Sequence, residues 1–277
     1  MKIDSVTVLY NPEAVVYDNF VRYSKFMNKA FVMDNSTQKN EDLLAKLKQL
    51  PNVVIVDMDG NKGIAQALKD GMLLAIEDKA DYCLNMDQDS IFPTEQYDEI
   101  LKYLEKYPEY GIIGLNFNAK DETQTGLVDF TIWLTSGNFI KIEDYVKVRG
   151  YNPDLFIDCV DYDLYEQFYS KGIKTAYINE ISLVHTIGNQ APHRFLWKKV
   201  HANNHSLVRY YYQYRNITYL YKYVNKAFYK KTYKKEMINK RIKILLYEKD
   251  RIKKFKMIRK GIRDGKKKIL GPYKEEK

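Results

Sequence analysis

The first half of the chain alternates between short apolar runs and longer stretches in which apolar residues recur every three or four positions. The apolar runs lie at residues 6–10, 30–33, 53–56, 82–86 and 111–117. The stretches with helical spacing lie at residues 15–27, 41–50, 64–78 and 94–107. Strands that alternate with helices of about 10–15 residues are typical of βαβ units. We therefore predict an α/β fold with a mostly parallel sheet flanked by helices.

The second half of the chain departs from this rhythm. Short apolar segments predict strands of a small mixed sheet at residues 127–134, 139–142 and 175–178. Residues 155–169 predict a helix, and from residue 207 the spacing is helical almost to the end of the chain. We expect a domain over residues 1–220 and a helical tail over residues 221–277, joined by a continuous helix near residues 219–230.

The composition fits a protein with one large core. The chain has 277 residues, of which 45% are hydrophobic, and this is enough to bury a full-sized core. Cys83 and Cys159 lie in apolar stretches, so we expect buried thiols in a reducing compartment. We expect no signal peptide before the first strand. No apolar run approaches the roughly 18 residues that a spanning helix needs, so the expected location is the cytoplasm.

Positive charge is concentrated in the predicted tail. Residues 222–277 contain 22 Lys and Arg against 6 Asp and Glu, whereas residues 1–221 contain 23 against 30. Apolar residues at helical spacing run through the tail, at Ile238, Ile242, Leu245, Ile252, Phe255, Ile258 and Ile262. A basic amphipathic helix is typical of an element that docks on an anionic membrane surface. Alternatively, the stripe packs on the body of the protein or on a second copy of the chain, as in a homodimer. The apolar stripe argues against a tail that binds nucleic acid, which would interleave basic and aromatic residues on one face.

Two carboxylates follow the strand predicted at residues 82–86, in the sequence Asp87-Gln88-Asp89-Ser90. Side chains at positions i and i+2 of an extended backbone point the same way. Ligands of open α/β sheets bind outside the carboxyl ends of the strands. The pair therefore indicates a divalent metal that carries a diphosphate. The alternative is a polar loop in which Ser90 caps the following helix.

Seven other short segments accompany this pair over roughly residues 5–220. They are Tyr10-Asn11-Pro12, Asp34-Asn35-Ser36, Thr135-Ser136-Gly137-Asn138, and residues 60–65, 155–163, 183–188 and 209–216. In this chain order the eight segments resemble the family 2 glycosyltransferases of the GT-A fold, and more closely their bacterial rhamnosyltransferase-like branch. A lone Asp-x-Asp pair is common by chance, whereas eight matches in family order are not.

The resemblance implies a nucleotide-sugar donor and a divalent metal, Mn²⁺ or Mg²⁺. Asp89 would ligate the metal, Asp87 would contact the ribose or a metal-bound water, and His185 would lie near the metal or the diphosphate. The alternative for His185 is a hydrogen-bonded structural histidine.

The resemblance also implies a pocket for the donor nucleotide. Asp34 would accept a hydrogen bond from the imide N–H of uracil or thymine, and the opposite wall would consist of Tyr10, Asn11 and Pro12. Further donor contacts are implied for Asn61, Gly63, Arg209 and Arg215. The alternatives are an Asx-turn at Asp34 and a simple loop around Asn61.

The catalytic base implied by the resemblance is Asp161, which would take a proton from the acceptor hydroxyl. The family's usual glutamate before this aspartate is replaced by Val160, a departure that the rhamnosyltransferase-like branch shares. The alternative is that Asp161 and Asp163 line a solvated helix face. Acceptor contacts are implied for Ser136, Gly137, Asn138, Asp158 and Trp133, although a core position suits Trp133 equally well.

We expect an inverting, metal-dependent glycosyltransferase that moves L-rhamnose from dTDP-β-L-rhamnose to a lipid-linked precursor of a cell-surface polysaccharide, such as a capsule or cell wall. It would work as a peripheral protein on the inner face of the cell membrane. A UDP-hexose is the alternative donor. A nucleotidyltransferase shares a similar sheet, but the first strand is not followed by the Gly-rich, basic phosphate loop that such an enzyme needs. A non-catalytic protein that binds nucleic acid or glycan through the tail is a rival of a different class.

Overall fold

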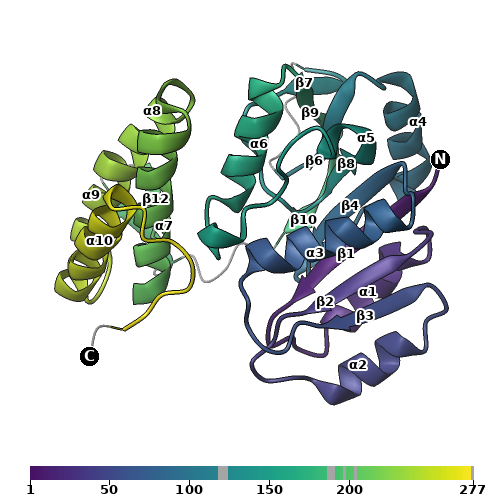
Figure 1. The fold of residues 1–277 in the computed structure, drawn as a ribbon, viewed down its shortest axis with the longest axis horizontal. Helices are drawn as coiled ribbons and strands as arrows, with labels where there is room; N and C mark the ends of the chain where they lie inside the picture. The colour runs from purple at the N-terminus through teal and green to yellow at the C-terminus, as the bar shows by residue number, and fades with distance from the viewer. Residues whose placement is uncertain (118–123, 186–190, 196–197, 203–204, 276–277) are drawn as a thin grey trace. The chain divides into compact units, whose positions relative to one another are not determined.

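The computed structural model describes residues 1–117, 124–185, 191–195, 198–202 and 205–275. The chain forms two compact units. The first unit comprises Met1–Pro153 and Asp161–Thr186 and holds the main sheet (Figure 1). The second comprises Asp154–Val160 and Ile187–Lys277 and holds the C-terminal helices.

The main sheet of the first unit has eight strands in the order β3-β2-β1-β4-β8-β6-β9-β7. The strands are β1 (Ile3–Leu9), β2 (Ala30–Asp34), β3 (Val53–Asp57), β4 (Tyr82–Asp87), β6 (Tyr110–Asn116), β7 (Leu127–Asp129), β8 (Asn138–Lys141) and β9 (Lys174–Ser182). Strands β3, β2, β1 and β4 run parallel, as do β6 and β9. Strand β8 is antiparallel to both of its neighbours, and β7 is antiparallel to β9. The predicted mostly parallel sheet is confirmed.

Helices pack on both faces of this sheet. They are α1 (Val16–Ser24), α2 (Glu41–Lys48), α3 (Ile64–Glu77), α4 (Tyr97–Lys106), α5 (Ile142–Tyr145) and α6 (Val160–Ser170), with short 3₁₀ turns at Thr94–Gln96 and Pro153–Leu155. The apolar sides of α1, α2 and α4 share one buried cluster with the strands. Helix α3 packs against β1, where a Cβ atom added to Gly71 would lie 2.5 Å from Cγ1 of Val6. Because the strands are covered by helices, their residues are apolar in runs rather than in alternation.

Two predictions for the second half were wrong in their boundaries. The strand expected at residues 127–134 ends at Asp129. The helix expected from residue 155 begins only at Val160, because Phe156, Asp158 and Cys159 adopt positive φ angles of 60–64°. Left-handed backbone at three residues other than glycine is incompatible with a helix.

Short strands were missed by the sequence analysis. Strand β5 (Ser90–Ile91) pairs with β10 (Val184–His185), and β11 (Ala191–Phe195) pairs with β12 (Lys198–Ala202). A strand of two residues has no period that a pattern can reveal.

The second unit consists mainly of helices. They are α7 (Leu207–Tyr219), α8 (Lys226–Lys235), α9 (Arg241–Tyr247) and α10 (Arg251–Lys266), with π-helical turns at Leu220–Val224 and Glu236–Lys240. The continuous helix predicted near residues 219–230 is interrupted at Asn225, which has φ −148° and ψ 97°. The side chain of Asn225 accepts a hydrogen bond from the Phe228 amide at 3.1 Å and so caps α8.

Helix α10 packs closely on α7 through two glycines. A Cβ atom at Gly261 would lie 2.4 Å from the Tyr211 carbonyl oxygen, and one at Gly265 would lie 2.3 Å from the Arg215 carbonyl oxygen. Any larger residue would force the two helices apart. The contact brings Ile258 of α10 and Ile244 of α9 into a buried cluster with two tyrosines of α7.

The apolar stripe of the tail divides into two groups. Phe255, Ile258 and Ile262 pack in the cluster on α7. In contrast, Ile238, Ile242, Leu245 and Ile252 are exposed, together with Leu246. The chain is extended at Glu248 and left-handed at Asp250, so α9 and α10 are separate helices and the apolar residues do not form one continuous face. Across the described part of the chain, none of the helices has the length and hydropathy to cross a bilayer.

Candidate functional site

The carboxyl ends of three neighbouring parallel strands carry the predicted donor site. Leu9 of β1 pairs with Asp34 of β2, and Val8 pairs with Asp87 of β4. The register therefore brings Asp34, the loop that begins at Tyr10, and Asp87 to one edge of the sheet. This is the edge at which open α/β sheets bind their ligands.

Asp34 is a buried carboxylate with one unused oxygen. It is 2% exposed, and its Oδ1 accepts a hydrogen bond from the Ser36 amide at 3.3 Å. Among the described residues, its buried Oδ2 has no hydrogen-bond partner. Because an unsatisfied buried acceptor is costly, this oxygen is suited to accept a hydrogen bond from a ligand. The Ser36 contact also shows that the Asx-turn and a ligand-binding role are compatible.

Asn11 and Pro12 hold the loop that follows β2. Oδ1 of Asn11 accepts hydrogen bonds from the amides of Thr37 at 3.0 Å and Gln38 at 2.9 Å. The Pro12 carbonyl accepts one from the Asn40 side chain at 3.1 Å. Both residues therefore hold this loop in place, and their contact with a donor base stays a prediction.

Gln88 joins Tyr10 to the acidic turn. Its side-chain oxygen accepts a hydrogen bond from the Tyr10 amide at 2.8 Å, and its side-chain nitrogen donates to the Tyr10 carbonyl at 3.3 Å. Tyr10 is 46% exposed, so its ring is accessible to a ligand. The two-way contact fixes the turn between Asp87 and Asp89 against the first loop.

Asn61 and Gly63 lie in the loop before α3. Oδ1 of Asn61 accepts hydrogen bonds from the Gly63 amide at 2.9 Å and from the Asn35 side chain at 3.2 Å. Asn35 in turn accepts from the Lys62 amide at 2.7 Å. Gly63 has φ +90°, a conformation that favours glycine, and begins α3. The loop is thereby fixed to the end of β2, beside Asp34.

The acidic turn lies between β4 and β5. The Asp87 amide donates to Oγ of Ser136 at 3.0 Å, and Oγ of Ser136 contacts Oγ of Ser90 at 2.8 Å. Asp87 is half-buried and Asp89 is exposed. His185 pairs with Ser90 across the small two-stranded sheet, so its backbone lies beside the turn, whereas its side chain lies outside the description, as do residues 186–188 of the same motif.

Ser136, Gly137 and Asn138 are buried beside this turn. The Gly137 amide donates to the Asn85 carbonyl at 2.7 Å, and Gly137 has φ +76°. The Asn138 side chain donates to Oη of Tyr165 at 2.8 Å and to the Thr135 carbonyl at 2.9 Å. These contacts fix the three residues beside the acidic turn. A direct contact of any of them with an acceptor stays a prediction.

Trp133 lies in an aromatic cluster. Its ring stacks on Tyr177 at a centroid distance of 4.2 Å and lies 5.5 Å from Phe130. Its indole N–H donates to the Leu115 carbonyl at 3.0 Å. The contacts describe a packed, partly buried tryptophan, which is the alternative that the sequence left open.

Asp161 lies in the first turn of α6 and is partly exposed. Its Oδ1 accepts a hydrogen bond from the Tyr162 amide at 2.9 Å, and a helix N-terminus favours a carboxylate. Two buried tyrosines neighbour it, Tyr151 and Tyr165, whose pKa values are raised by burial first and by the charge of Asp161 to a lesser extent. Tyr151 accepts a hydrogen bond from the Asn85 side chain in β4 at 2.6 Å, two residues before Asp87. Tyr151 thus feels the charge of Asp161 and is hydrogen-bonded to the strand that leads into the acidic turn.

Asp163 differs from Asp161 in being buried. Burial raises its pKa to about 6, opposed by the charge of Arg149 and a hydrogen bond from Gln167. Nη2 of Arg149 lies 3.8 Å from its Oδ1, and Nε2 of Gln167 donates to its Oδ2 at 3.0 Å. Asp163 does not line a solvated helix face, since it is 1% exposed.

The raised pKa of Asp163 predicts a pH dependence of stability. A carboxyl whose pKa is higher in the folded state contributes stability that is full below about pH 4 and lost as the pH rises through about 6. Asp163→Asn should therefore be more stable than the natural protein at pH 7.5, by on the order of 2 kcal/mol, and the difference should shrink towards pH 4.5. Urea unfolding at several pH values checks this, and parallel curves for the two proteins would contradict it.

Asp158 lies in the second unit, together with Arg209 and Gln213 of α7. Its Oδ1 accepts hydrogen bonds from Nε of Arg209 and from the Gln213 side chain, both at 3.3 Å. Arg209 is 47% exposed, so it keeps surface available for an anion. Asp158 stands three residues before Asp161 in the chain.

Arg215 is fully buried, and its guanidinium contacts backbone carbonyls. It donates to Asp154 at 3.1 Å, to Leu155 at 2.9 Å and to Gly271. The neighbouring Asn216 donates to the carbonyls of Leu155, Ile157 and Asp158 at 2.8–2.9 Å. The loop over residues 154–159, which contains the three left-handed residues, is thus held by α7. These contacts give Arg215 a structural role, and its contact with the donor stays a prediction.

A unit whose parallel strands end in a buried carboxylate and an acidic turn has the architecture of a GT-A-type transferase. Residues 22–154 match the model of a family described as Glycosyl transferase family 2. Over 238 residues the chain is 28% identical to a dTDP-rhamnosyl transferase, RfbF of Shigella flexneri, with 77% of this chain and 78% of that protein covered.

Solved structures show the same fold at low sequence identity. TarS 1–349 of S. aureus in complex with UDP-GlcNAc matches with a TM-score of 0.62 and 12% identity. The match covers 96% of this chain and 80% of that chain. The mannosyltransferase PcManGT of Pyrobaculum calidifontis in complex with GDP-Man and Mn²⁺ has a TM-score of 0.58, 14% identity, and coverage of 78% and 62%. Residues 22–154 of the chain are therefore similar to the family 2 glycosyltransferases, and the predicted GT-A fold is confirmed.

The sequence analysis missed the buried polar residues that support the site. Asn85 and Asn138 face each other across β4 and β8 and bond to Tyr151 and Tyr165. The signal was present in Asn85, a polar residue inside an otherwise apolar strand, because such a residue needs a buried partner. Gln88 gave no comparable signal.

Proposed function

We propose that this glycosyltransferase is an inverting rhamnosyltransferase whose donor is dTDP-β-L-rhamnose. The similarity to a dTDP-rhamnosyl transferase over 77% of the chain supports this sugar and nucleotide. Oδ2 of buried Asp34, which has no partner within the described part of the chain, supports a thymine or uracil base, because the imide N–H of either base would satisfy it. A UDP-hexose is the second candidate, since uracil presents the same imide.

The observation that carries the proposal is the placement of four acids, Asp34, Asp87, Asp89 and Asp161, in the first unit. Asp34 and the Asp87–Asp89 turn end the two strands that flank β1, and the charge of Asp161 acts on buried Tyr151, which is hydrogen-bonded to Asn85 of β4. A base pocket, a diphosphate site and a general base are the parts that sugar transfer needs. A non-catalytic binding protein has no use for the partly exposed Asp161.

Asp87 and Asp89 would hold the divalent metal, Mn²⁺ or Mg²⁺. Within the described ranges no group of three or more His, Cys, Asp and Glu side chains is placed to hold a metal. Two carboxylates nevertheless fit Mg²⁺, which usually keeps waters and substrate phosphates as its other ligands. When bound, the metal would offset the charge of the departing nucleoside diphosphate.

Asp161 would act on the acceptor. Its carboxylate takes the proton from the acceptor hydroxyl, and the hydroxyl oxygen forms a bond to the anomeric carbon. The bond from that carbon to the diphosphate oxygen breaks, and its electron pair leaves with the nucleoside diphosphate. Because the attack is opposite the leaving group, the anomeric configuration inverts.

A screen of nucleotide sugars tests the donor. With Mn²⁺ or Mg²⁺ we expect release of dTDP from dTDP-β-L-rhamnose at a rate well above that from UDP-glucose, UDP-GlcNAc or GDP-mannose, and its loss in excess EDTA. Faster release of UDP from a UDP-sugar would favour the second candidate, a UDP-hexose, as the donor. Full activity in EDTA would reject the metal, and no turnover of any donor would reject the proposed function.

We also propose that the enzyme works as a cytoplasmic, peripheral protein on the inner face of the cell membrane. Residues 1–220 would transfer sugar to a lipid-linked glycan, and residues 221–277 would dock on anionic lipid.

The exposed part of the apolar stripe supports docking. Ile238, Ile242, Leu245, Leu246 and Ile252, here called the aliphatic face, are 46–76% exposed. Lysines and arginines surround them in the chain, and each adds attraction to an anionic leaflet. A second copy of the chain is a less suitable partner, because two such basic faces repel each other.

Substitutions in the aliphatic face are expected to weaken vesicle binding. Removal of the whole tail is a poor test, since α10 covers α7. Ile242→Ser with Leu245→Ser should lower the partition onto vesicles that contain phosphatidylglycerol roughly tenfold, and added salt should weaken binding further. Leu73→Ser with Val146→Ser, at 44% and 56% exposure in the first unit, is the matched control. Equal binding of both double variants would contradict docking, and a dimer that only the tail variant dissociates would make the face a subunit interface.

A further inference from the structure

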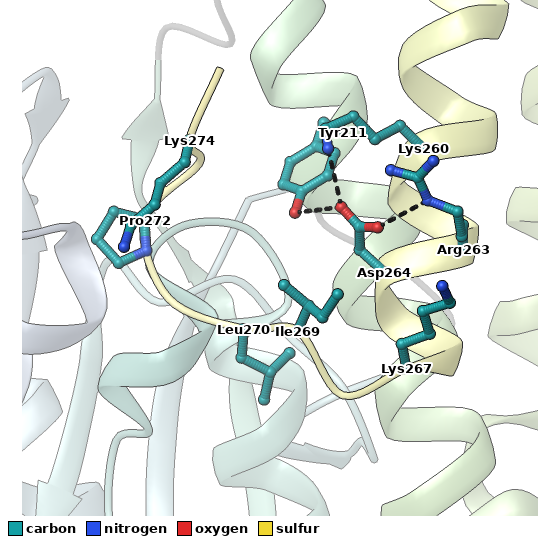
Figure 2. A pocket seen from close by; sticks show the side chains of 9 residues that line it. All are labelled: Tyr211, Lys260, Arg263, Asp264, Lys267, Ile269, Leu270, Pro272 and Lys274. Carbon is teal, nitrogen blue, oxygen red and sulfur yellow. Dashed lines mark hydrogen bonds and ion pairs between the residues drawn. The ribbon is translucent and has the colours of Figure 1, made fainter. Parts of the chain in front are cut away.

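The second unit contains a cavity of about 520 Å³ beside α10. Its lining comes from α7, from the last turns of α10 and from the segment that follows α10, all within the second unit. Figure 2 shows the side chains around it. The volume falls in the range of about 300–1,000 Å³ that is usual for small-molecule sites. Tyr211 lies in the segment 209–216 that carries the family resemblance, whereas the lining residues from α10 and from the segment after it lie outside all eight segments.

Positive charge dominates the lining. Among the described residues, four cations line the cavity, Lys260, Arg263, Lys267 and Lys274, against the one carboxylate of Asp264. Four like charges around one cavity repel each other unless an anion lies between them. A lining of this kind is therefore suited to a ligand that carries more than one negative charge.

The charge of Asp264 is already compensated by the protein. Its carboxylate is 2% exposed and accepts a hydrogen bond from Oη of Tyr211 at 3.1 Å. Nε of Arg263 lies 3.1 Å from its Oδ1, and Nζ of Lys260 lies 3.3 Å from its Oδ2 (Figure 2). Asp264 orients these two cations on the wall and does not repel an anion as an isolated carboxylate would.

The remaining lining is apolar. Ile269, Leu270 and Pro272 form part of the wall (Figure 2), and Ile269 is 51% exposed. Lys267 and Lys274 lie on either side of this segment in the sequence, and both are exposed. The cavity thus offers cationic groups for a phosphate and apolar surface for the organic part attached to it.

We propose that this cavity binds a phosphate or diphosphate monoester that carries an apolar group. Lys267 and Lys274 would contact the phosphate oxygens, and Ile269 and Leu270 would contact the attached group. A terminal phosphate suits the site because it carries close to two charges, whereas a phosphodiester carries one. The ligand is either a soluble phosphate ester or the headgroup of a phosphate-bearing lipid, and both present the same chemistry. The site is independent of the donor pocket, so it does not rest on the proposed reaction.

Binding of inorganic pyrophosphate in EDTA tests the site without a contribution from the metal. Calorimetry with the full chain should show saturable binding, and Lys267→Gln with Lys274→Gln should weaken it roughly tenfold or more. Lys249→Gln with Lys256→Gln removes the same charge from exposed positions of the second unit outside the cavity and should bind as the natural protein does. Asp89→Ala should also bind normally, so failure of the donor site and failure of this site are distinguishable.

Vesicles distinguish the two sources of the phosphate. Phosphatidic acid displays a phosphate monoester and phosphatidylglycerol a diester, so vesicles of matched charge should differ in binding if a lipid headgroup enters the cavity. This difference in vesicle binding should disappear in the double variant that carries Lys267→Gln and Lys274→Gln. Pyrophosphate binding without a lipid preference would assign the site to a soluble ester. Non-saturable binding, or equal weakening by both lysine pairs, would overturn the proposal.

Discussion

Replacing Asp89 with alanine is expected to lower kcat for sugar transfer by roughly 10³-fold or more. The exposed carboxylate stands at the tip of the turn that Gln88 fixes against Tyr10, and without it the site loses one of its two proposed metal ligands. The fold should persist, because Asp89 is exposed at a loop. Steady-state transfer at several Mn²⁺ concentrations checks this, with an unchanged urea midpoint as the control. Activity within threefold of the natural enzyme would reject Asp89 as a ligand.

Asp161→Asn provides a matched contrast. This substitution should also reduce kcat by roughly 10²–10⁴-fold, the usual contribution of a general base, but it should leave the affinity for the donor and the dependence on metal unchanged. The amide can no longer take the proton of the acceptor hydroxyl. Donor affinity measured by calorimetry separates the two variants. Loss of donor binding in Asp161→Asn would place that carboxylate in the donor site.

Replacing Arg215 with methionine is expected to destabilise the second unit by about 3 kcal/mol or more. The guanidinium is fully buried, and it donates to three backbone carbonyls and to the Asn216 side chain. Burial also lowers its pKa, and the hydrogen bonds to these acceptors compensate for the water that the buried charge loses. Methionine keeps the volume but leaves the carbonyls without their donor. Urea unfolding followed by circular dichroism gives the change in the free energy of unfolding.

Arg209→Met is the control for Arg215, since both lie on α7. Arg209 is 47% exposed, and its ion pair with Asp158 spans 3.3 Å, so its loss should cost less than about 1 kcal/mol. We further expect Arg215→Met to lower kcat under conditions in which it remains folded, because the loop it holds leads directly into Asp161. Equal stability of the two variants would contradict the structural role of Arg215.

The sequence predicts the parallel half of the sheet well, because each strand there is an uninterrupted apolar run followed by a polar loop. The strand ends at Asp34 and Asp87 follow from the same pattern. The breaks at Asn225 and at residues 248–250 were not predictable, since apolar spacing continues across them and only the backbone angles change. For the same reason, the apolar residues of the tail look like one continuous stripe in the sequence, although they lie on separate helices.

The loop before Asp161 depends on contacts that no local pattern encodes. Phe156, Asp158 and Cys159 adopt left-handed angles, and the carbonyls of this loop are held by side chains some 60 residues later in the chain. Local preference alone argues against such a conformation. Only the second unit, once folded, makes it stable.

The two cysteines of the chain differ in accessibility, with Cys83 buried and Cys159 partly exposed. A thiol-reactive fluorophore should therefore label the natural protein at a single position, inside the loop that Arg215 and Asn216 hold. Emission from that dye would follow the loop in real time during donor and acceptor binding, without an engineered cysteine. Cys159 thus provides a natural labelling site two residues from Asp161.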